Sequence, residues 1–310
     1  MEPKNQTAPY RKRHRRLLRY GARALLAPAI LCLAPAVIPV AEASDDFLSI
    51  SFSEKKQVRS SMRWMHGLPK LMMVGQESDT PVSTATLASG VSPVTKEAYY
   101  SDHTGDKHMP YAVIGKLFYV KPDNTVATCN GALTGSSDVI LTAAHCVLDV
   151  GGEWHRYFLF IQGYATTQPR VYAISCAAVP GAWGSLAGWE SYPYDYAFMK
   201  LRRPSSDGSL GMSSGIPPRH LQLIGYADNL AEGQLLVEVE ATLDKFDGNL
   251  IRASNNPLKS GSSGMPWIAA SIVHSVSSFW LPGEERSMWG PRFTQSTFSL
   301  LRHVQNGCSS

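Results

Sequence analysis

Residues 141–146 read LTAAHC and place a histidine beside a cysteine, at the end of a short apolar run. A second stretch, residues 260–266, reads SGSSGMP and places Ser263 in a turn flanked by glycines. Between the two, residues 194–201 read YDYAFMKL, so that Asp195 leads into an apolar strand. The chain therefore offers His145, Asp195 and Ser263 in this order, at separations that favour one shared site.

These three residue types together indicate nucleophilic catalysis. A serine hydroxyl is a weak nucleophile at neutral pH, so a neighbouring imidazole must accept its proton during attack on a carbonyl. A carboxylate on the other ring nitrogen fixes the tautomer of that imidazole. We therefore predict Ser263 as nucleophile, His145 as general base and acid, and Asp195 as the orienting carboxylate.

The glycine before this turn predicts a place for the negative charge that develops during attack. The backbone N–H groups of Gly261 and Ser263 can together form an oxyanion hole, and a side chain at residue 261 would hinder that backbone geometry. The sequence thus predicts both halves of an acyl-transfer site within one turn.

Several short apolar runs, separated by Gly, Pro, Asn and Asp, predict an all-β fold. Turn-forming residues at such short intervals are typical of two β-barrels rather than of β-α-β units. The runs lie at residues 111–120, 139–141, 158–161, 171–174 and 235–239.

Residues 110–304 resemble the trypsin-like serine proteases of the chymotrypsin fold, and among them the bacterial glutamyl endopeptidase branch. Besides the histidine and serine motifs, the resemblance rests on CNGAL at residues 129–133, IVH at 272–274, and an ending with RFT at 292–294 and FSLL at 298–301. It implies two six-stranded antiparallel β-barrels with a C-terminal helix. His145 and Asp195 would belong to the first barrel and Ser263 to the second, with the site between them.

Departures from the trypsin pattern bear on activation and specificity. Ser262 stands where trypsin carries an aspartate that binds a new N-terminal ammonium, so activation by that ion pair is not expected. Pro257 replaces the aspartate that selects Lys or Arg. Glutamyl endopeptidases use a histidine after the serine turn and a threonine before the serine, and the matching substrate-binding candidates are His274 and Leu258. A preference for acidic residues and a broader or small-apolar preference both stay open.

The N-terminal region predicts export. Residues 11–19 are strongly basic, residues 24–40 are apolar but interrupted by prolines, and residues 41–43 read AEA, which together are typical of a signal peptide. The apolar run is short for a membrane anchor. We therefore expect a signal peptide at residues 1–43, a propeptide or permanent N-terminal extension at 44–100, and a protease domain at 101–310. The mature protein would be secreted or periplasmic, without a stable membrane anchor, and a removed propeptide would make it a zymogen.

Four cysteines follow the predicted signal peptide, and export would place them in an oxidising compartment. The resemblance implies a disulfide between Cys129 and Cys146, which would clamp the segment that carries His145. Cys176 and Cys308 then remain, either as a second disulfide or as two separate thiols.

The charge distribution argues against a nucleic-acid partner. The chain carries a net charge of +4, but residues 1–43 hold eight basic and two acidic residues, so the remainder has a net charge of about −2. His103, Asp106 and His108 match no metal-ligand template. We expect no metal or cofactor, and a monomer whose partner is a protein or peptide substrate.

The sequence therefore predicts a secreted serine endopeptidase that forms an acyl-enzyme on Ser263. Two alternatives share the same residues. One is an esterase on the same site, and the other is a catalytically inactive homologue that acts as a binding module.

Overall fold

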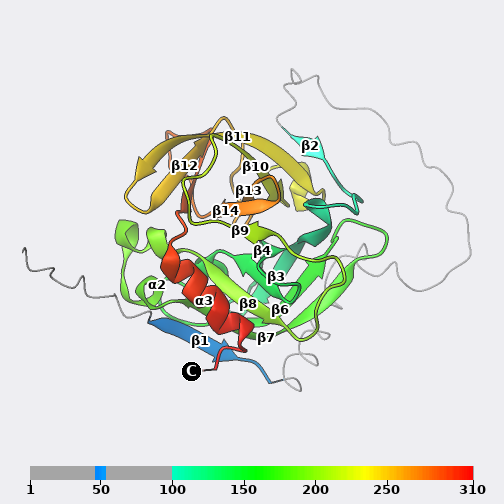
Figure 1. Ribbon diagram of the computed structural model, residues 1–310, viewed down its shortest axis with the longest axis vertical. Coiled ribbons are helices and arrows are strands. Elements are labelled where there is room, and N and C mark those ends of the chain that lie inside the picture. The colour runs from blue at the N-terminus through cyan, green and yellow to red at the C-terminus, as the bar shows by residue number, and fades with distance from the viewer. Residues whose placement is uncertain (1–45, 54–99, 310) are drawn as a thin grey trace, which may run out of the picture. The chain divides into compact units, whose positions relative to one another are not determined.

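The computed structural model describes residues 46–53 and 100–309, and these form two mainly antiparallel sheets and a C-terminal helix (Figure 1). The predicted signal peptide and most of the segment at residues 44–100 lie outside the described residues. None of the helices in the described part of the chain has the length and apolar character that a membrane span requires.

The first sheet closes into a six-stranded barrel. Its strands follow the order β7-β6-β3-β4-β5-β8, and β8 pairs again with β7. The barrel strands are β3 (Ile114–Val120), β4 (Val126–Leu133), β5 (Val139–Thr142), β6 (Arg156–Gln162), β7 (Arg170–Pro180) and β8 (Ala197–Leu201). A barrel leaves no unpaired edge between these strands, and its interior is filled by buried apolar side chains.

The second sheet contains β15-β12-β11-β10-β13-β14-β9, with β2 paired to β11. These strands are β2 (Ser101–Asp102), β9 (Gly211–Met212), β10 (His220–Gly225), β11 (Val237–Asp247), β12 (Leu250–Ser254), β13 (Pro266–Ala269), β14 (Ile272–Val276) and β15 (Ser287–Pro291). The chain that follows β14 meets β15 at an isolated bridge from Phe279 to Trp289 and at a hydrogen bond from the N–H of Ser278 to the carbonyl of Trp289. The second sheet is thus less completely closed than the six-stranded barrel expected from the resemblance.

Strand β11 illustrates why these residues form a half-exposed sheet. In its first half, VEVEATL, the residues alternate between the buried and the more exposed face, and the four residues after Leu243 are all exposed. Successive side chains of a strand point to opposite faces, so the Val residues enter the second core while the Glu residues face outward.

Within residues 46–53 and 100–309, five turns of 3-10 helix and two α-helices connect and cover these sheets. The 3-10 turns are Tyr111–Val113, Ala144–Cys146, Gly188–Glu190, Tyr192–Tyr194 and Ala231–Gly233, and the α-helices are α2 (Gly181–Ser185) and α3 (Gln295–Gln305). Residues 111–113 therefore precede β3 as a helical turn and are not part of the long first strand that the apolar pattern predicted. The C-terminal helix α3 confirms the expected ending.

Helix α3 begins at a capping box and packs on the first barrel. The side chain of Thr294 accepts from the backbone of Thr297, whose hydroxyl accepts from the N–H of Thr294. Leu300 and Val304 are fully buried in the first core. The helix thereby carries the chain end back to β7.

Strand β1 (Phe47–Ser51) extends the first sheet beyond the barrel. It pairs antiparallel with β7, from Phe47 opposite Pro180 to Ser51 opposite Cys176. The chain continues this contact at Phe52, whose N–H donates to the carbonyl of Ser175 at 2.8 Å. These residues belong to the segment expected to be a propeptide or an N-terminal extension, and this part of it pairs with the barrel.

Both pairs of cysteines form disulfides. Cys129–Cys146 joins β4 to the turn that carries His145, as the resemblance implied. Cys176–Cys308 joins β7 to the chain end after α3, which resolves the alternative of separate thiols.

We expect the double variant C176S/C308S to lose about 2–5 kcal/mol of unfolding free energy, because this disulfide closes a segment of 132 residues and limits the unfolded chain. Urea denaturation of the two purified proteins measures the difference. Wild type reduced with dithiothreitol serves as a control, since it loses both disulfides and should unfold at a urea concentration no higher than the variant does. An unchanged midpoint in the variant would contradict the expectation.

Candidate active site

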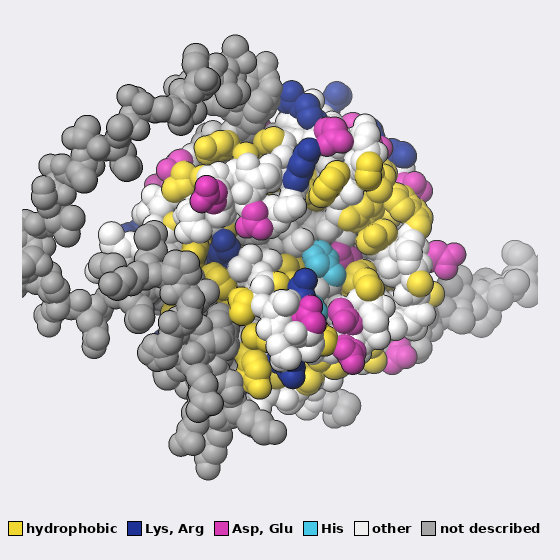
Figure 2. Space-filling model, turned by 180° about the vertical axis from the view of Figure 1, so that it is seen from behind, with side chains coloured by type: hydrophobic (Ala, Val, Ile, Leu, Met, Phe, Trp, Pro, Cys, Tyr) yellow, Lys and Arg dark blue, Asp and Glu magenta, His cyan; other side chains and the backbone are white. Residues whose placement is uncertain are grey.

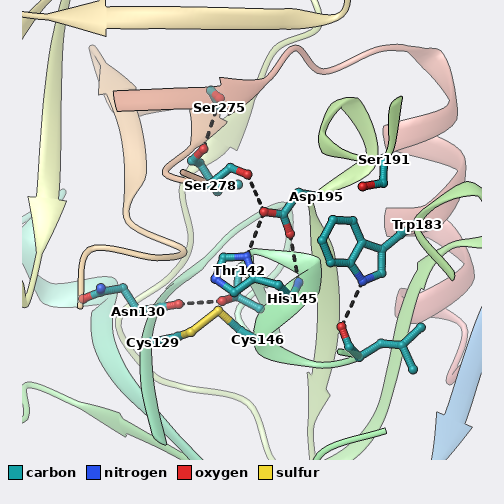
Figure 3. Close-up of polar contacts among 12 residues, drawn as sticks. Cys129, Asn130, Thr142, His145, Cys146, Trp183, Ser191, Asp195, Ser275 and Ser278 are labelled. Atoms are coloured by element: carbon teal, nitrogen blue, oxygen red, sulfur yellow. Dashed lines mark hydrogen bonds and ion pairs between the residues drawn. A yellow bond between two sulfur atoms is a disulfide. The ribbon is translucent and has the colours of Figure 1, made fainter. Parts of the chain in front are cut away.

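His145 and Asp195 form a buried hydrogen-bonded pair (Figure 3). The imidazole Nδ1 lies 2.8 Å from Asp195 Oδ2, and the backbone N–H of His145 donates to Oδ1 at 2.8 Å. Asp195 is completely buried, whereas the His145 side chain is 26% exposed. One carboxylate therefore fixes both the ring and the backbone of His145, and the ring keeps an accessible face.

The fold brings these two residues together through adjacent strands. His145 lies in the 3-10 turn that follows β5, and Asp195 lies just before β8. Strands β5 and β8 pair with Thr142 opposite Ala197, so the chain after β5 and the chain before β8 emerge at the same end of the barrel. The sequence predicted that His145 and Asp195 would meet, and the register of these two strands brings them together.

The electrostatics of the pair favour the ionised form of both groups. Burial opposes protonation of His145, but the neighbouring Asp195 carboxylate outweighs that effect and holds the imidazole pKa above its ordinary value. Burial likewise opposes ionisation of Asp195, while His145 and the hydroxyl of Ser278 together hold the pKa of the carboxyl below its usual range. An imidazolium formed at His145 is thus stabilised by a carboxylate that stays ionised.

Ser278 is a member of this arrangement that sequence reasoning missed. Its buried hydroxyl donates a short hydrogen bond to Asp195 Oδ2 (Figure 3). The hydroxyl contacts the carboxylate rather than the imidazole, so it positions Asp195 and does not transfer its proton to His145. Ser278 lies two residues after β14, and its local sequence, SVSSF, carries no signal that would distinguish it.

The turn that contains Ser263 packs directly against the segment leading to His145. The carbonyl of Ser263 accepts from the N–H of Asn130 at 2.8 Å. A Cβ at Gly264 would lie 2.5 Å from Thr142 Oγ1 and 3.3 Å from the N of Ala143, so only glycine fits there. Among the hydrogen bonds of the described residues, none joins the Ser263 hydroxyl to His145, which is common in proteins without bound substrate.

Gly261 is required by the same turn. Its φ is +79°, and a Cβ there would lie 2.4 Å from the carboxyl carbon of Asp228 and 2.5 Å from the N of Asp228. In the part of the chain that the structure describes, the N–H groups of Gly261 and Ser263 donate to no backbone carbonyl. Two backbone donors of one turn are therefore available to an oxyanion.

Asn130 lies in the first barrel and stabilises this turn. It was part of the CNGAL motif in the sequence, where no role was predicted for it. It is fully buried, and its Nδ2 donates to the carbonyls of Gly261 at 2.8 Å and Ser263 at 3.2 Å. The Asn130 carbonyl in turn accepts from Thr142 Oγ1 at 2.7 Å (Figure 3). Asn130 thus connects the serine turn, through its side chain, with the segment that precedes His145, through its backbone carbonyl.

The hydroxyl of Ser262 closes the turn internally. It donates to the carbonyl of Lys259 at 2.5 Å, and the N–H of Ser262 donates to the same carbonyl at 3.2 Å. Ser262 is 2% exposed. Ser262 therefore forms uncharged contacts within its own turn, whereas the aspartate at this position in trypsin binds an N-terminal ammonium.

Ser263 and Ser278 both line a cavity of about 210 Å³. Its remaining lining residues all come from the second sheet and its loops, namely Lys259, Ser260, Ser262, Phe279, Trp280 and Met288. Lys259 Nζ lies 2.6 Å from Glu285 Oε2, so its charge is paired. Met288 is 1% exposed, and together with Trp280 it gives the cavity a partly apolar lining.

The two predicted specificity residues lie elsewhere. His274 and Leu258 are both buried and neither lines this cavity. Leu258 packs in the core of the second sheet. His274 lies in β14 with its Nδ1 buried without a hydrogen-bond partner among the described residues, and burial lowers its pKa. The geometry therefore gives no support to an acidic preference through His274.

One group of possible metal ligands in the described residues consists of Cys129, His145 and Cys146. Both sulfurs belong to the Cys129–Cys146 disulfide, which excludes them as thiolate ligands.

Comparison with known proteins assigns the fold. The sequence matches no protein-family model and no curated protein. Among solved structures, the protease Anisep from Arthrobacter nicotinovorans is similar with a TM-score of 0.57 and 20% identity, covering 68% of this chain and 100% of that one. A Glu endopeptidase is similar with a TM-score of 0.56 and 17% identity, covering 67% of this chain and 96% of that one.

A third similar structure is an inactivated protease paralogue of the scabies mite, with a TM-score of 0.51 and 17% identity, covering 66% of this chain and 98% of that one. At these identities the likeness concerns the fold alone. The chain has the chymotrypsin-like fold of serine proteases, with a hydrogen-bonded arrangement of His145, Asp195 and Ser278.

Proposed function

We propose that this protein is a serine endopeptidase in which Ser263 is the nucleophile. The observation that carries the proposal is the buried pair of His145 and Asp195 next to a glycine-flanked serine turn with two available N–H donors. Ser263 would attack the carbonyl carbon of a peptide bond while its proton passes to His145 Nε2.

Each residue then has a defined task. The N–H groups of Gly261 and Ser263 would bind the oxyanion of the tetrahedral intermediate. Its collapse breaks the C–N bond, and the imidazolium of His145 gives its proton to the leaving amine. His145 would next take a proton from water, whose oxygen attacks the acyl-enzyme ester and releases the acid. Asp195 stays ionised throughout and stabilises the imidazolium.

The cavity beside Ser263 supports a preference for short side chains before the cleaved bond. Met288 and Trp280 line it, and its one ammonium group, on Lys259, is paired with Glu285. These contacts favour the small-apolar alternative, while a preference for acidic residues stays a prediction.

We also propose that the protein acts outside the cytoplasm, as the N-terminal pattern predicts. The two disulfides support this location, because disulfides persist mainly in oxidising compartments.

A fluorophosphonate probe tests the nucleophile directly. We expect a covalent adduct on Ser263, located by mass spectrometry, and its loss in His145→Ala, because the probe needs a hydroxyl activated by a base. Turnover of matched ester and peptide substrates then separates an esterase from a peptidase. An unlabelled wild-type protein would contradict the proposal and favour an inactive homologue that binds a partner.

A further inference from the structure

We infer that a second cavity, which His145 lines, binds a lysine or arginine side chain of the substrate after the cleaved bond. This inference rests on the proposed endopeptidase function. It concerns a cavity of about 700 Å³ that His145 lines and Ser263 does not. Its other lining residues all belong to the first barrel, namely Tyr119, Lys121, Pro122, Asp123, Asp149, Val150, Glu153 and His155.

The position of this cavity assigns it to the leaving group. The cavity of about 210 Å³ contains Ser263 and only residues of the second sheet and its loops, which suits the acyl part of the substrate. His145 must give its proton to the leaving amine, so the residues that follow the cleaved bond have to pass the imidazole. The larger cavity borders that imidazole from the first barrel and therefore receives them.

The charges at this cavity favour a cation. Asp123, Asp149 and Glu153 contribute three carboxylates, against one ammonium from Lys121. Asp123 accepts from the hydroxyl and the N–H of Thr125, and these bonds hold the pKa of its carboxyl below the usual range. Figure 2 shows acidic side chains gathered beside a histidine on the face opposite to that of Figure 1.

Arg156 is a further cation near this cavity, but it is not one of the lining residues. Its guanidinium donates to the carbonyls of Lys121 and Pro122 and to Asn124 Oδ1. These contacts direct it to the loop between β3 and β4. The net charge of the lining side chains stays negative.

A buried histidine also lines this cavity. His155 is 3% exposed, lines the cavity and stacks on Tyr119 with ring centroids 4.6 Å apart. Its Nε2 lies 3.1 Å from the carbonyl of His145, so Nε2 carries the proton and Nδ1 is an acceptor. Within the described residues this Nδ1 has no partner. The carboxylates at this cavity match the donors of a Lys or Arg side chain, and burial lowers the pKa of His155, so that its ring adds no opposing positive charge.

A series of internally quenched peptides tests the inference. The peptides share one acyl segment and differ only in the first two residues after the cleaved bond, which are lysine, the uncharged isostere norleucine, or glutamate. We expect kcat/KM to be about five- to tenfold higher for lysine than for norleucine at low ionic strength, since several partly exposed charges act together. In 1 M NaCl this ratio should approach one, because rim charges are screened.

The double variant D123N/E153Q should reduce the lysine-to-norleucine ratio to about twofold or less. Glu153 and Asp123 are exposed, so the substitutions remove charge without opening the core. The control is E240Q, which removes an exposed carboxylate from β11 in the second sheet and should keep the full ratio.

Three outcomes can be distinguished. A protein that is labelled on Ser263 and cleaves peptides without preferring lysine overturns this inference alone. A preference that D123N/E153Q leaves unchanged also overturns it, because the carboxylates would then not be the cause. A protein that is neither labelled nor cleaves any peptide overturns the proposed function and this inference with it.

Discussion

Ser263→Ala is expected to lower kcat by about a million-fold on a peptide that the wild type cleaves. In the proposed mechanism the substitution removes the oxygen that forms the acyl-enzyme, while the proposed oxyanion donors of the turn and the cavity beside it remain. Steady-state and single-turnover assays on the purified variant measure the loss, and the fluorophosphonate adduct should disappear with it. Because Ser263 is half-buried and its hydroxyl makes no hydrogen bond among the described residues, we expect unfolding free energy close to that of the wild type.

Ser278→Ala is the matched control for this prediction. It also removes one hydroxyl from the site. That hydroxyl donates a hydrogen bond to Asp195 and, unlike the hydroxyl of Ser263, is not proposed to attack the substrate carbonyl. We expect kcat to fall only about ten- to hundredfold, the amount that one hydrogen bond to a charged group supports. Labelling on Ser263 should continue. If Ser278→Ala abolished labelling while Ser263→Ala retained it, the assignment of the nucleophile would be wrong.

Asp195→Asn is expected to lower kcat by about ten thousand-fold. Asparagine keeps the size of the side chain but loses the charge that stabilises the His145 imidazolium. Its amide can also present a donor to Nδ1, which would favour the wrong tautomer of the ring. The buried position of Asp195, with no water to replace the lost charge, makes the effect large.

The same variant should move the pH dependence of activity in a defined direction. Catalysis needs neutral His145, so kcat/KM falls as the pH drops below the pKa of the imidazole. In the wild type, Asp195 raises this pKa, and the acid limb should therefore lie above the ordinary histidine value of about 6.5. In Asp195→Asn the limb should shift to lower pH.

pH–rate profiles of the wild type and of Asp195→Asn, with Ser278→Ala as control, measure this shift of the acid limb. Ser278→Ala keeps the carboxylate, so its acid limb should stay closer to that of the wild type. A variant D195N that retained more than a tenth of the wild-type kcat, or whose acid limb moved to higher pH, would contradict the role given to Asp195.

The short apolar runs and the motifs around His145 and Ser263 predicted the all-β fold, and the motifs also named His145 and Asp195, which the structure brings together. Glycine at residues 261 and 264 follows from positive φ, which is local to the turn, and from a lack of space, which is imposed by segments far away in the sequence. The Cys129–Cys146 disulfide and the C-terminal helix were likewise predicted and found.

The sequence was less informative where contacts join distant segments. His274 was expected at the specificity cavity because it follows the serine turn by a plausible distance, yet the strand register of β14 buries it elsewhere and brings Ser278 to Asp195 instead. Asn130 was visible beside Cys129, but its bonds to the carbonyls of Gly261 and Ser263 span more than 130 residues.

The amino-acid sequence by itself determined which chemical groups this protein can use, because backbone strain, alternation of apolar residues and residue chemistry are properties of short segments. The tertiary structure alone decided which serine meets Asp195, which strand pairs with β7 outside the barrel, and which charges surround each cavity. Those choices depend on strand register and packing between segments far apart in the chain, and a shift of one residue turns a side chain to the other face of its sheet.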